Sequence, residues 1–428
     1  MRNKLKLFFY NYRTWIYNLQ YIFVSLILLV IVTHIDHSTA EWVYNLPRVL
    51  FTGLDLAKTV LSSLSAGLLS ITIFGFSTIL SVLVFYSGNF SSQVVENFVG
   101  KKITMKVLGI FMGGFIYCIG SLNFMRSYDE ARYVLAGTVG VIYVAFCVVY
   151  MIVFIQETIK SVNVVNVISD IFEETLPVIE EEVGERDHDY LKDKLNEEHL
   201  SIKSDTSGYF EYFNTSEAIG KLKDFSGTFV VTPITGDFVV EGQEIGEIHI
   251  ENFEEYEELG EDLKKLYHIQ DNQISITNYR YGIDKIVQIG IQGLSSGIKD
   301  PSTTIHCIRI LSILLSKLAS VNPNHHIEKL ENEGTIYQAS YTFKDDFSFA
   351  LMPIINLGKE HAQLMSAVFE GFTIMSSKAT SINRDLLVEL GENIYKETIK
   401  DFTFQSDKEV INKNYERFLS VCGGREEY

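Results

Sequence analysis

Four long apolar runs occupy most of the first 160 residues, with only short polar stretches between them. They predict membrane-spanning helices at residues 15–35, 56–86, 106–124 and 133–155. Each run is long enough to cross the ~30 Å hydrocarbon layer of a bilayer as a helix. A cleaved signal peptide is the alternative for the first run. Three further apolar runs follow it, so we interpret it as a span.

After the fourth run the pattern changes. Residues 172–198 form an acidic segment, which predicts a solvated linker helix. Residues 207–214 and 227–250 alternate apolar and polar positions and are rich in β-branched residues, as is typical of short strands. Glycine-containing turns at 235–237 and 241–243 predict two hairpins in a small β module.

A helical period returns at Tyr279 and predicts one helix over 283–294. A second helix is predicted from Pro301 to about Ala319, because Asp300 is a good N-cap and proline is favoured at the first helical position. The glycine- and serine-rich stretch between them is therefore a tight corner between two helices.

The remaining chain predicts one hairpin and three helices. The hairpin covers 335–351 and turns at Asp345 and Asp346. The helices are expected at about 359–378, 381–403 and 406–421.

These patterns together predict an integral membrane α-helical protein with four transmembrane helices. A cytosolic α+β region follows, with a small β-barrel- or sandwich-like module and a helical C-terminal part. The expected regions are a membrane domain at 1–160, an acidic helical linker at 161–206, a β module at 207–278 and an α+β domain at 279–428.

The distribution of charged residues predicts how the spans are oriented in the membrane. Residues 1–160 carry 12 Lys and Arg against 7 Asp and Glu, whereas the remaining chain has a net charge of −23. The basic residues gather before the first span and in the loop after the second, so the positive-inside rule places both termini in the cytoplasm. Arg126 and Arg132, in a loop that would face outward, weaken this argument. The acidic C-terminal part repels phosphates, which argues against nucleic acid as a partner.

The second span has a hydroxyl-bearing face. Its members lie at spacings of 4, 7, 7 and 4, which places them on one side of a helix: Thr59, Ser63, Ser70, Ser77 and Ser81. Such a face either packs closely on another helix or lines a path for an ion or small solute. The span centres hold no Asp, Glu, Lys or Arg, which disfavours a proton-relay transporter.

The third span carries small residues typical of a helix-packing seam. Gly109 and Gly113 are four apart, with Gly114 and Gly120 beside them.

The corner between the two predicted helices is a second candidate site. Its polar residues are Ser295, Ser296, Asp300, Ser302 and Thr303. Either they form a packed corner, or they line a ligand site or a contact between subunits. Because Asp300 would occupy the helix N-terminus, the corner does not suit a phosphate.

The sequence contains no H-E-x-x-H and no phosphate-binding loop. Its G-x-S-x-G match, residues 293–297, lies in the predicted corner between two helices and does not follow a predicted strand, as a nucleophile elbow would. The four cysteines are far apart, which argues against a zinc site or a disulfide framework. His34, Asp36 and His37 are candidate metal ligands at the end of the first span, but we interpret them as interfacial residues. We therefore expect no metal site and no cofactor.

Several motifs in one order resemble a family of bacterial predicted membrane proteins, domain of unknown function 2254. The corner stretch 290–304, GIQGLSSGIKDPSTT, is similar to the family's ALRALSPGINDPxTA-like run. The stretches 76–93 and 107–119 resemble its membrane motifs, and 207–214 with 236–245 resemble its SGYxQxxD and PGDFVxxGxPL. The resemblance implies four spans, a cytosolic domain and no assigned reaction.

The chain departs from the family pattern at five polar or special positions. They are Ser92, Gln93, Gln292, Ser296 and Lys299. An activity that depends on the family's residues at these positions would be missing here.

Three hypotheses for the function follow. The first is a non-enzymatic protein of the plasma (inner) membrane, expected to be a homo-oligomer, whose cytosolic domain assembles or senses an unknown ligand. This domain biases a membrane domain that passes an ion or small solute. The second is a membrane-anchored scaffold without permeation, and the third is a membrane-bound enzyme.

Overall fold

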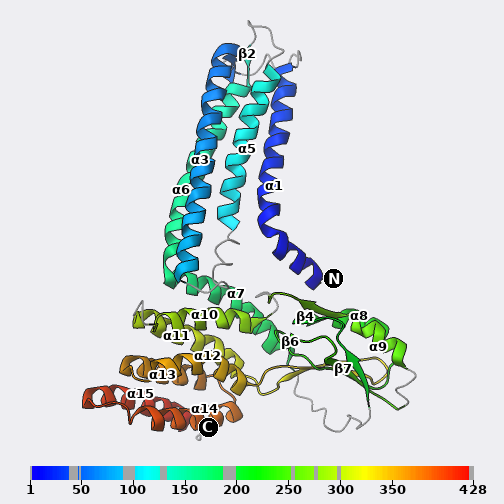
Figure 1. Ribbon diagram of the computed structural model, residues 1–428, viewed down its shortest axis with the longest axis vertical. Helices are drawn as coiled ribbons and strands as arrows, with labels where there is room; N and C mark the ends of the chain where they lie inside the picture. Colours follow the sequence, from blue (N-terminus) through cyan, green and yellow to red (C-terminus); the bar gives the residue numbers. More distant parts are fainter. Residues whose placement is uncertain are drawn as a thin grey trace. The chain divides into compact units, whose positions relative to one another are not determined.

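The computed structural model describes most of the chain. The described residues are 2–37, 47, 50–89, 102–125, 133–186, 199–251, 256–273, 278–295 and 300–423. They form two compact units, residues 1–166 and 167–428. Figure 1 traces both units.

The first unit is a bundle of four long helices. They are α1 (Arg2–His37), α3 (Leu54–Asn89), α5 (Lys102–Phe124) and α6 (Ala136–Val162). All four contain a stretch long and apolar enough to cross a membrane. The four predicted spans are therefore confirmed.

Helix α5 is the central member of this bundle and packs against the other three. Of its apolar stretch, 56% is buried, compared with 17–22% in the others. The predicted glycine seam is confirmed, because a side chain at Gly113 would collide with Ser25 of α1 and one at Gly114 with Tyr143 of α6. Glycine lets these helices approach closely where lipid supplies no hydrophobic driving force.

One end of the bundle is fastened by polar contacts. Strands β1 (Thr52–Gly53) and β2 (Tyr133–Val134) pair antiparallel there. Asp36 is buried and accepts hydrogen bonds from the backbone N–H groups of Leu135 (2.7 Å) and Ala136 (3.3 Å). It thus neutralises the positive end of α6 and serves as its cap. Asp36 therefore has a structural role at this position.

Helix α7 (Val164–Glu185) opens the second unit, and it is not the solvated linker that its acidic composition predicted. One of its faces is buried: Val167, Ile168, Ile171, Thr175 and Ile179. Thr175 packs against Gly282, where an added Cβ would collide with the hydroxyl oxygen of Thr175. The acidic residues therefore occupy only part of the surface of a packed helix. Residues 187–198 of the predicted linker lie outside the described residues.

The strands of the second unit form two open sheets. The larger has the order β3-β7-β5-β10-β9: β3 (Leu200–Lys203), β7 (Glu244–His249), β5 (Thr228–Val231), β10 (Thr335–Ala339) and β9 (His325–Lys329). The smaller has the order β6-β4-β8: β6 (Phe238–Val239), β4 (Gly208–Phe213) and β8 (Tyr267–Gln270). Both sheets contribute to one hydrophobic core, for example through Phe210 and Ile248, together with α8 (Thr215–Lys221) and α9 (Glu257–Lys264). Among the described strands no closed barrel forms.

The predicted hairpins were wrong, although the turns were placed correctly. Gly236 and Gly242 have positive φ angles of 99° and 83°, as glycine turns require. However, β6 pairs with β4, whereas β5 and β7 pair with each other in the larger sheet. The turns therefore carry the chain between two sheets rather than back along the same one.

The hairpin predicted at 335–351 was also wrong. Strand β10 pairs with β9 and, in parallel, with β5, and the chain then enters helix α12 (Phe343–Gly358). Thr342 and Asp345 form a reciprocal capping box that starts this helix. Asp346, expected in a turn, is instead buried in the first helical turn.

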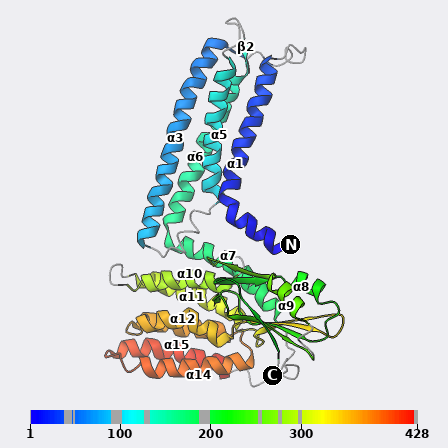
Figure 2. The same ribbon diagram turned by 45° about the vertical axis from the view of Figure 1, so that its right-hand side comes forward.

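The rest of the second unit is helical. Its helices are α10 (Tyr279–Gln292), α11 (Pro301–Leu318), α12, α13 (Ala362–Ser376), α14 (Ser381–Thr398) and α15 (Gln405–Gly423). Helix α11 packs on α10, α12 and α13, and α13 packs on α14 and α15. Both views show these helices as successive layers (Figures 1 and 2). The helices predicted in this region are confirmed.

Candidate functional site

The hydroxyl-bearing face of the second span lies on the outside of the four-helix bundle. All five of its residues are exposed in the single chain: Thr59, Ser63, Ser70, Ser77 and Ser81. The opposite side of α3 is the one that packs inside the bundle, through residues such as Ala57, Leu61 and Leu68. Within one chain the hydroxyl face is therefore neither an internal packing seam nor the lining of an internal path.

Three hydroxyls of this face, those of Thr59, Ser70 and Ser81, donate to carbonyls of their own helix. Ser70 donates to the carbonyl of Ala66 and Ser81 to that of Ser77, each at 2.9 Å. A serine bonded to its own helix in this way leaves no unmet donor towards lipid. The face is compatible with lipid, with another subunit and with water.

The corner before α11 is built as predicted around Asp300. Its carboxylate accepts from the backbone N–H of Thr303 at 3.3 Å and from the Thr303 hydroxyl at 2.6 Å. The hydrogen bond from the Thr303 side chain lowers the pKa of Asp300. Nearby, the Thr304 hydroxyl donates to the carbonyl of Gly290 at 2.9 Å and ties α11 to α10. The predicted cap is confirmed.

The side chains of the other described candidate residues of the corner do not contact the carboxylate of Asp300 in this way. Ser295 donates to the carbonyl of Gln292, and Ser302 is exposed. Ser296 lies outside the described residues. Whether a ligand or a second subunit contacts this corner stays a prediction.

Replacing the cap tests its structural role. The Asp300→Ala variant of segment 167–428 is expected to lose about 1 kcal/mol of unfolding free energy, because one helix N-terminus loses its acceptor. Urea denaturation followed by circular dichroism measures the difference. Asp385→Ala, which removes an exposed carboxylate from α14, serves as the control and should change stability by less than about 0.5 kcal/mol. An unchanged midpoint for Asp300→Ala would contradict the structural role.

A partly buried network of polar contacts connects the residue before β6 with helices α10 and α12. Asp237 accepts from the Tyr341 hydroxyl at 2.6 Å and from the backbone of Ile234 at 2.9 Å. The guanidinium of Arg280 lies 3.2 Å from the centre of the Tyr341 ring. Its Nε donates to Asp346 at 2.7 Å. This network of contacts joins the smaller sheet to the helical layers.

Asp346 is the most buried charged residue of this network, with 0% of its surface exposed. The Tyr279 hydroxyl lies 3.1 and 3.0 Å from its two carboxylate oxygens. Burial raises the pKa of Asp346, and the Arg280 guanidinium opposes this shift. The arrangement is that of a buried ion pair, which fixes the packing of elements rather than exposing a reactive group.

A second buried cluster holds the C-terminal end of α7. Glu182 accepts from Ser340 at 2.7 Å and from Arg186 at 3.2 Å, and it lies 3.3 Å from His326 Nε2. Arg186 also donates to the carbonyl of Pro323 at 3.4 Å. The end of α7 is thereby fixed to β9 and to the segment after β10.

Charge coupling in this cluster is strong. Burial by itself would raise the pKa of Glu182, but His326, Arg186 and Ser340 lower it to about 2. Burial lowers the pKa of His326, yet the hydrogen bond and charge of Glu182 give a net rise. Both groups are therefore favoured in their charged forms.

Serine, histidine and glutamate also occur in hydrolytic triads, but the geometry here differs. In a triad the acid contacts one imidazole nitrogen and the serine the other. Here Ser340 (2.8 Å) and Glu182 (3.3 Å) both face Nε2 of His326. Ser340 is itself only 5% exposed. The serine and the acid therefore share one imidazole nitrogen, so the three residues do not form the relay of a triad.

One group of residues that the sequence analysis missed has metal-ligating chemistry. Among the described residues, His199, Glu247 and His249 are the group whose potential ligand atoms converge. Glu247 and His249 are two positions apart in a strand and must share a face, which is a signal available in the sequence. His199 precedes β3, and only the pairing of β3 with β7 brings it to them.

Comparison with known proteins identifies a family. No curated protein and no solved structure was found to be similar to the chain. The model of a family described as predicted membrane protein (DUF2254) matches residues 11–373. This match covers all four candidate membrane spans and continues into α13 of the second unit. The chain therefore belongs to the DUF2254 family of predicted membrane proteins.

Proposed function

We propose that this protein is a non-enzymatic plasma-membrane protein whose second unit senses a ligand or assembles subunits and controls the membrane unit. In this proposal the membrane unit passes an ion or small solute. The observation that carries it is the connection between the two units through α6 and α7.

Only Asn163, in an extended conformation, separates the end of α6 at Val162 from the start of α7 at Val164. The Asn163 side chain accepts from the backbone N–H of Val165 and starts the next helix directly. The far end of α7 is fixed by the buried Glu182 cluster. In this proposal, a movement of α7 caused by a change in the second unit is passed to the fourth span through this single connecting residue.

Permeation in this proposal needs more than one subunit. The hydroxyl face of α3 is exposed on the outside of one bundle, so a polar path requires several copies with these faces towards a common axis. A closed ring of identical subunits is the usual way to build such an axis. We therefore propose a homo-oligomer.

A scaffold without permeation is the second candidate, and one observation favours it. The hydroxyls of Ser70 and Ser81 are already bonded to their own helix, so these two groups require neither water nor a polar partner. In a scaffold this face contacts lipid or packs against a neighbouring subunit.

Flux measurements separate the two candidates. The purified protein in liposomes is expected to release or admit at least one of a panel of common ions and small neutral solutes faster than empty liposomes. A panel without any flux, in a preparation shown to be folded and inserted, would leave the scaffold as the function.

Topology tests the proposed orientation. With the half-buried Cys422 replaced by serine, cysteines introduced at Ser38 and Ser127 are expected to react with an impermeant thiol reagent from outside the cell. A cysteine at Ser91 is expected to react only after the membrane is opened. This follows from the basic residues before the first span and after the second. The reverse labelling pattern would place both termini outside.

A further inference from the structure

We propose that His199, Glu247 and His249 form a binding site for a divalent first-row transition metal, with Zn²⁺ as the best fit. The site lies on β3 and β7 of the second unit. The proposal goes beyond the proposed function, because metal binding is measured directly and does not depend on solute flux.

The pairing of the strands creates the cluster. In the antiparallel ladder Ser201 lies opposite Glu247 and Leu200 opposite Ile248, so His199 comes opposite His249. Residues that face each other across a ladder, and residues two apart in one strand, share a face of the sheet. Ile248 points the other way into the core, so the cluster occupies the sheet face away from that core.

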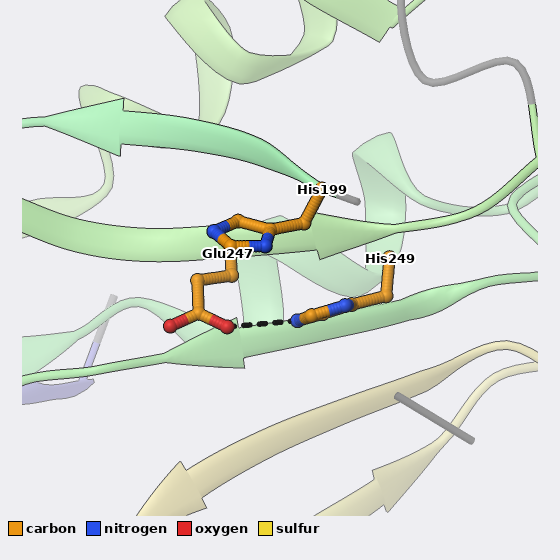
Figure 3. A group of neighbouring side chains, drawn as sticks. All are labelled: His199, Glu247 and His249. Atoms are coloured by element: carbon orange, nitrogen blue, oxygen red, sulfur yellow. Dashed lines mark hydrogen bonds and ion pairs between the residues drawn. The ribbon is translucent and has the colours of Figure 1, made fainter. Parts of the chain in front are cut away.

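The side chains converge on this face. The potential ligand atoms of all three residues lie within 4.8 Å of one another. His249 Nε2 is 2.8 Å from Glu247 Oε2, and the ring centroids of the two histidines are 5.0 Å apart. Figure 3 shows both rings and the carboxylate on the same side of the strands.

The donor set matches a known coordination chemistry. Two imidazole nitrogens and one carboxylate oxygen are ligands of zinc sites that keep a fourth position open. Zinc–ligand bonds of about 2.0–2.1 Å require the donors to lie about 3.3 Å apart in a tetrahedron. His199 and Glu247 are partly exposed, with side-chain exposures of 30% and 24%, and can rotate inward. His249, at 4%, is the fixed ligand.

Two neighbouring groups support a site rather than a simple ion pair. Glu244 Oε2 lies 3.7 Å from His199 Nε2. Glu244 pairs with Lys203 in the ladder, next to a shift in the register of β3 against β7. A carboxylate behind a ligating histidine orients the ring and strengthens it as a ligand. The Ser201 hydroxyl, opposite Glu247, is buried without a hydrogen-bond partner in the part of the chain that the structure describes. A water on the open position of the metal would supply that partner.

Pairwise contacts account for each imidazole separately, since His249 lies 2.8 Å from Glu247 and His199 lies 3.7 Å from Glu244. Neither contact brings the two rings together, whereas two imidazoles and a carboxylate can bind one metal ion. The convergence of all three side chains therefore fits a shared cation.

Metal titration of the full-length protein tests the proposal. The protein is purified in detergent without a polyhistidine tag, treated with a chelator, and titrated with Zn²⁺ by calorimetry. Co²⁺ reports the geometry through its visible absorption bands. We expect one Zn²⁺ per chain, tetrahedral Co²⁺ bands, and no comparable binding of Mg²⁺ or Ca²⁺, which prefer oxygen ligands.

Variants locate the metal. His199→Ala and Glu247→Gln are expected to weaken Zn²⁺ binding by about 100-fold or more, since each removes one of three ligands. Glu244→Gln is expected to weaken it by about 10-fold. His361→Ala removes an exposed histidine that makes no cap hydrogen bond in α13 and should leave binding unchanged.

Folding is checked separately, because His249 is buried and its replacement can disturb the sheet. The partly exposed His199 is therefore the decisive position, and its variant must show an unchanged circular dichroism spectrum in the absence of metal. Zn²⁺ binding that persists in His199→Ala and Glu247→Gln, or no stoichiometric Zn²⁺ binding by the unmodified protein, would overturn the proposal. Preferential binding of Mg²⁺ or Ca²⁺ would overturn it as well.

Discussion

The Ser70→Leu variant is expected to block solute flux while the protein still folds and assembles. Ser70 is exposed on the outer side of α3, and a side chain added at the neighbouring Gly67 would meet nothing within 4 Å. A leucine therefore fits the single chain without strain. In a path formed by several copies, one leucine from each copy narrows the opening and removes its hydroxyl lining.

Ser62→Leu is the matched control for this variant. Ser62 is an exposed serine of the same helix, but it lies off the face that carries Thr59, Ser63 and Ser70. It should leave both flux and assembly unchanged. Flux into liposomes and the size of the detergent-solubilised particle are measured on the same preparations.

The combination of the two readouts distinguishes the functions. Lost flux with normal particle size supports the path. Smaller particles with Ser70→Leu would mean that the face is a dry contact between subunits, because overpacking such a contact costs about 1–3 kcal/mol. Unchanged flux in a protein that does conduct would place the path elsewhere.

The Glu182→Gln variant is expected to destabilise the second unit by about 3 kcal/mol, since it leaves Arg186 and His326 without their counter-charge. The Arg186 side chain is only 1% exposed, so water cannot replace the lost partner. Urea denaturation of segment 167–428 measures the effect. Glu180→Gln is the control on the same helix, because Glu180 pairs with Lys317 at the surface and should contribute less than about 1 kcal/mol.

The pH dependence of stability gives a second readout of the same cluster. The pKa of Glu182 is lowered from 4.5 to about 2, so its contribution is present above pH 4.5 and is lost as the pH falls towards 2. The pKa of His326 is raised from 6.5, so its contribution is present below pH 6.5 and is lost as the pH rises through the raised value. Their joint contribution is complete between these two limits.

Stability of the unmodified unit should therefore decline as the pH rises above 6.5, and Glu182→Gln should remove most of this decline. A decline of the same size in both proteins would show that other groups control it. If Glu182→Gln also alters flux, the anchor of α7 contributes to control of the membrane unit, as proposed.

Local patterns in the sequence were sufficient for much of the fold. Hydrophobic length determined the four spans, because a helix that crosses lipid must satisfy its own backbone within one continuous apolar segment. The cap at Asp300 and Pro301 was equally predictable, since a cap depends on residues three or four positions apart. The capping box of Thr342 and Asp345 was such a signal too, and it was missed in favour of a hairpin.

Pairing between strands was decided only by the tertiary structure. The glycine turns at Gly236 and Gly242 formed as predicted, but the turns do not determine which strand becomes the neighbour. Strand β10 joins β5 across about 100 residues of chain because both can bury apolar side chains in one sheet. The His199, Glu247 and His249 cluster has the same origin, since it depends on the register of β3 against β7.

The sequence likewise did not predict which helix faces are exposed and which are buried. A stripe of serines on α3 suits a packing seam, a lipid-facing surface or a wet path, because small hydroxyl side chains fit all three. Packing of α5 against the opposite side of α3 left the stripe of Ser63, Ser70 and Ser77 on the outside. Similarly, the acidic composition of α7 concealed a buried face, because amphipathic helices place charges and apolar residues on different sides. The sequence by itself thus determined the segments and their ends, whereas contacts between distant segments decided which of their faces are buried and which side chains meet.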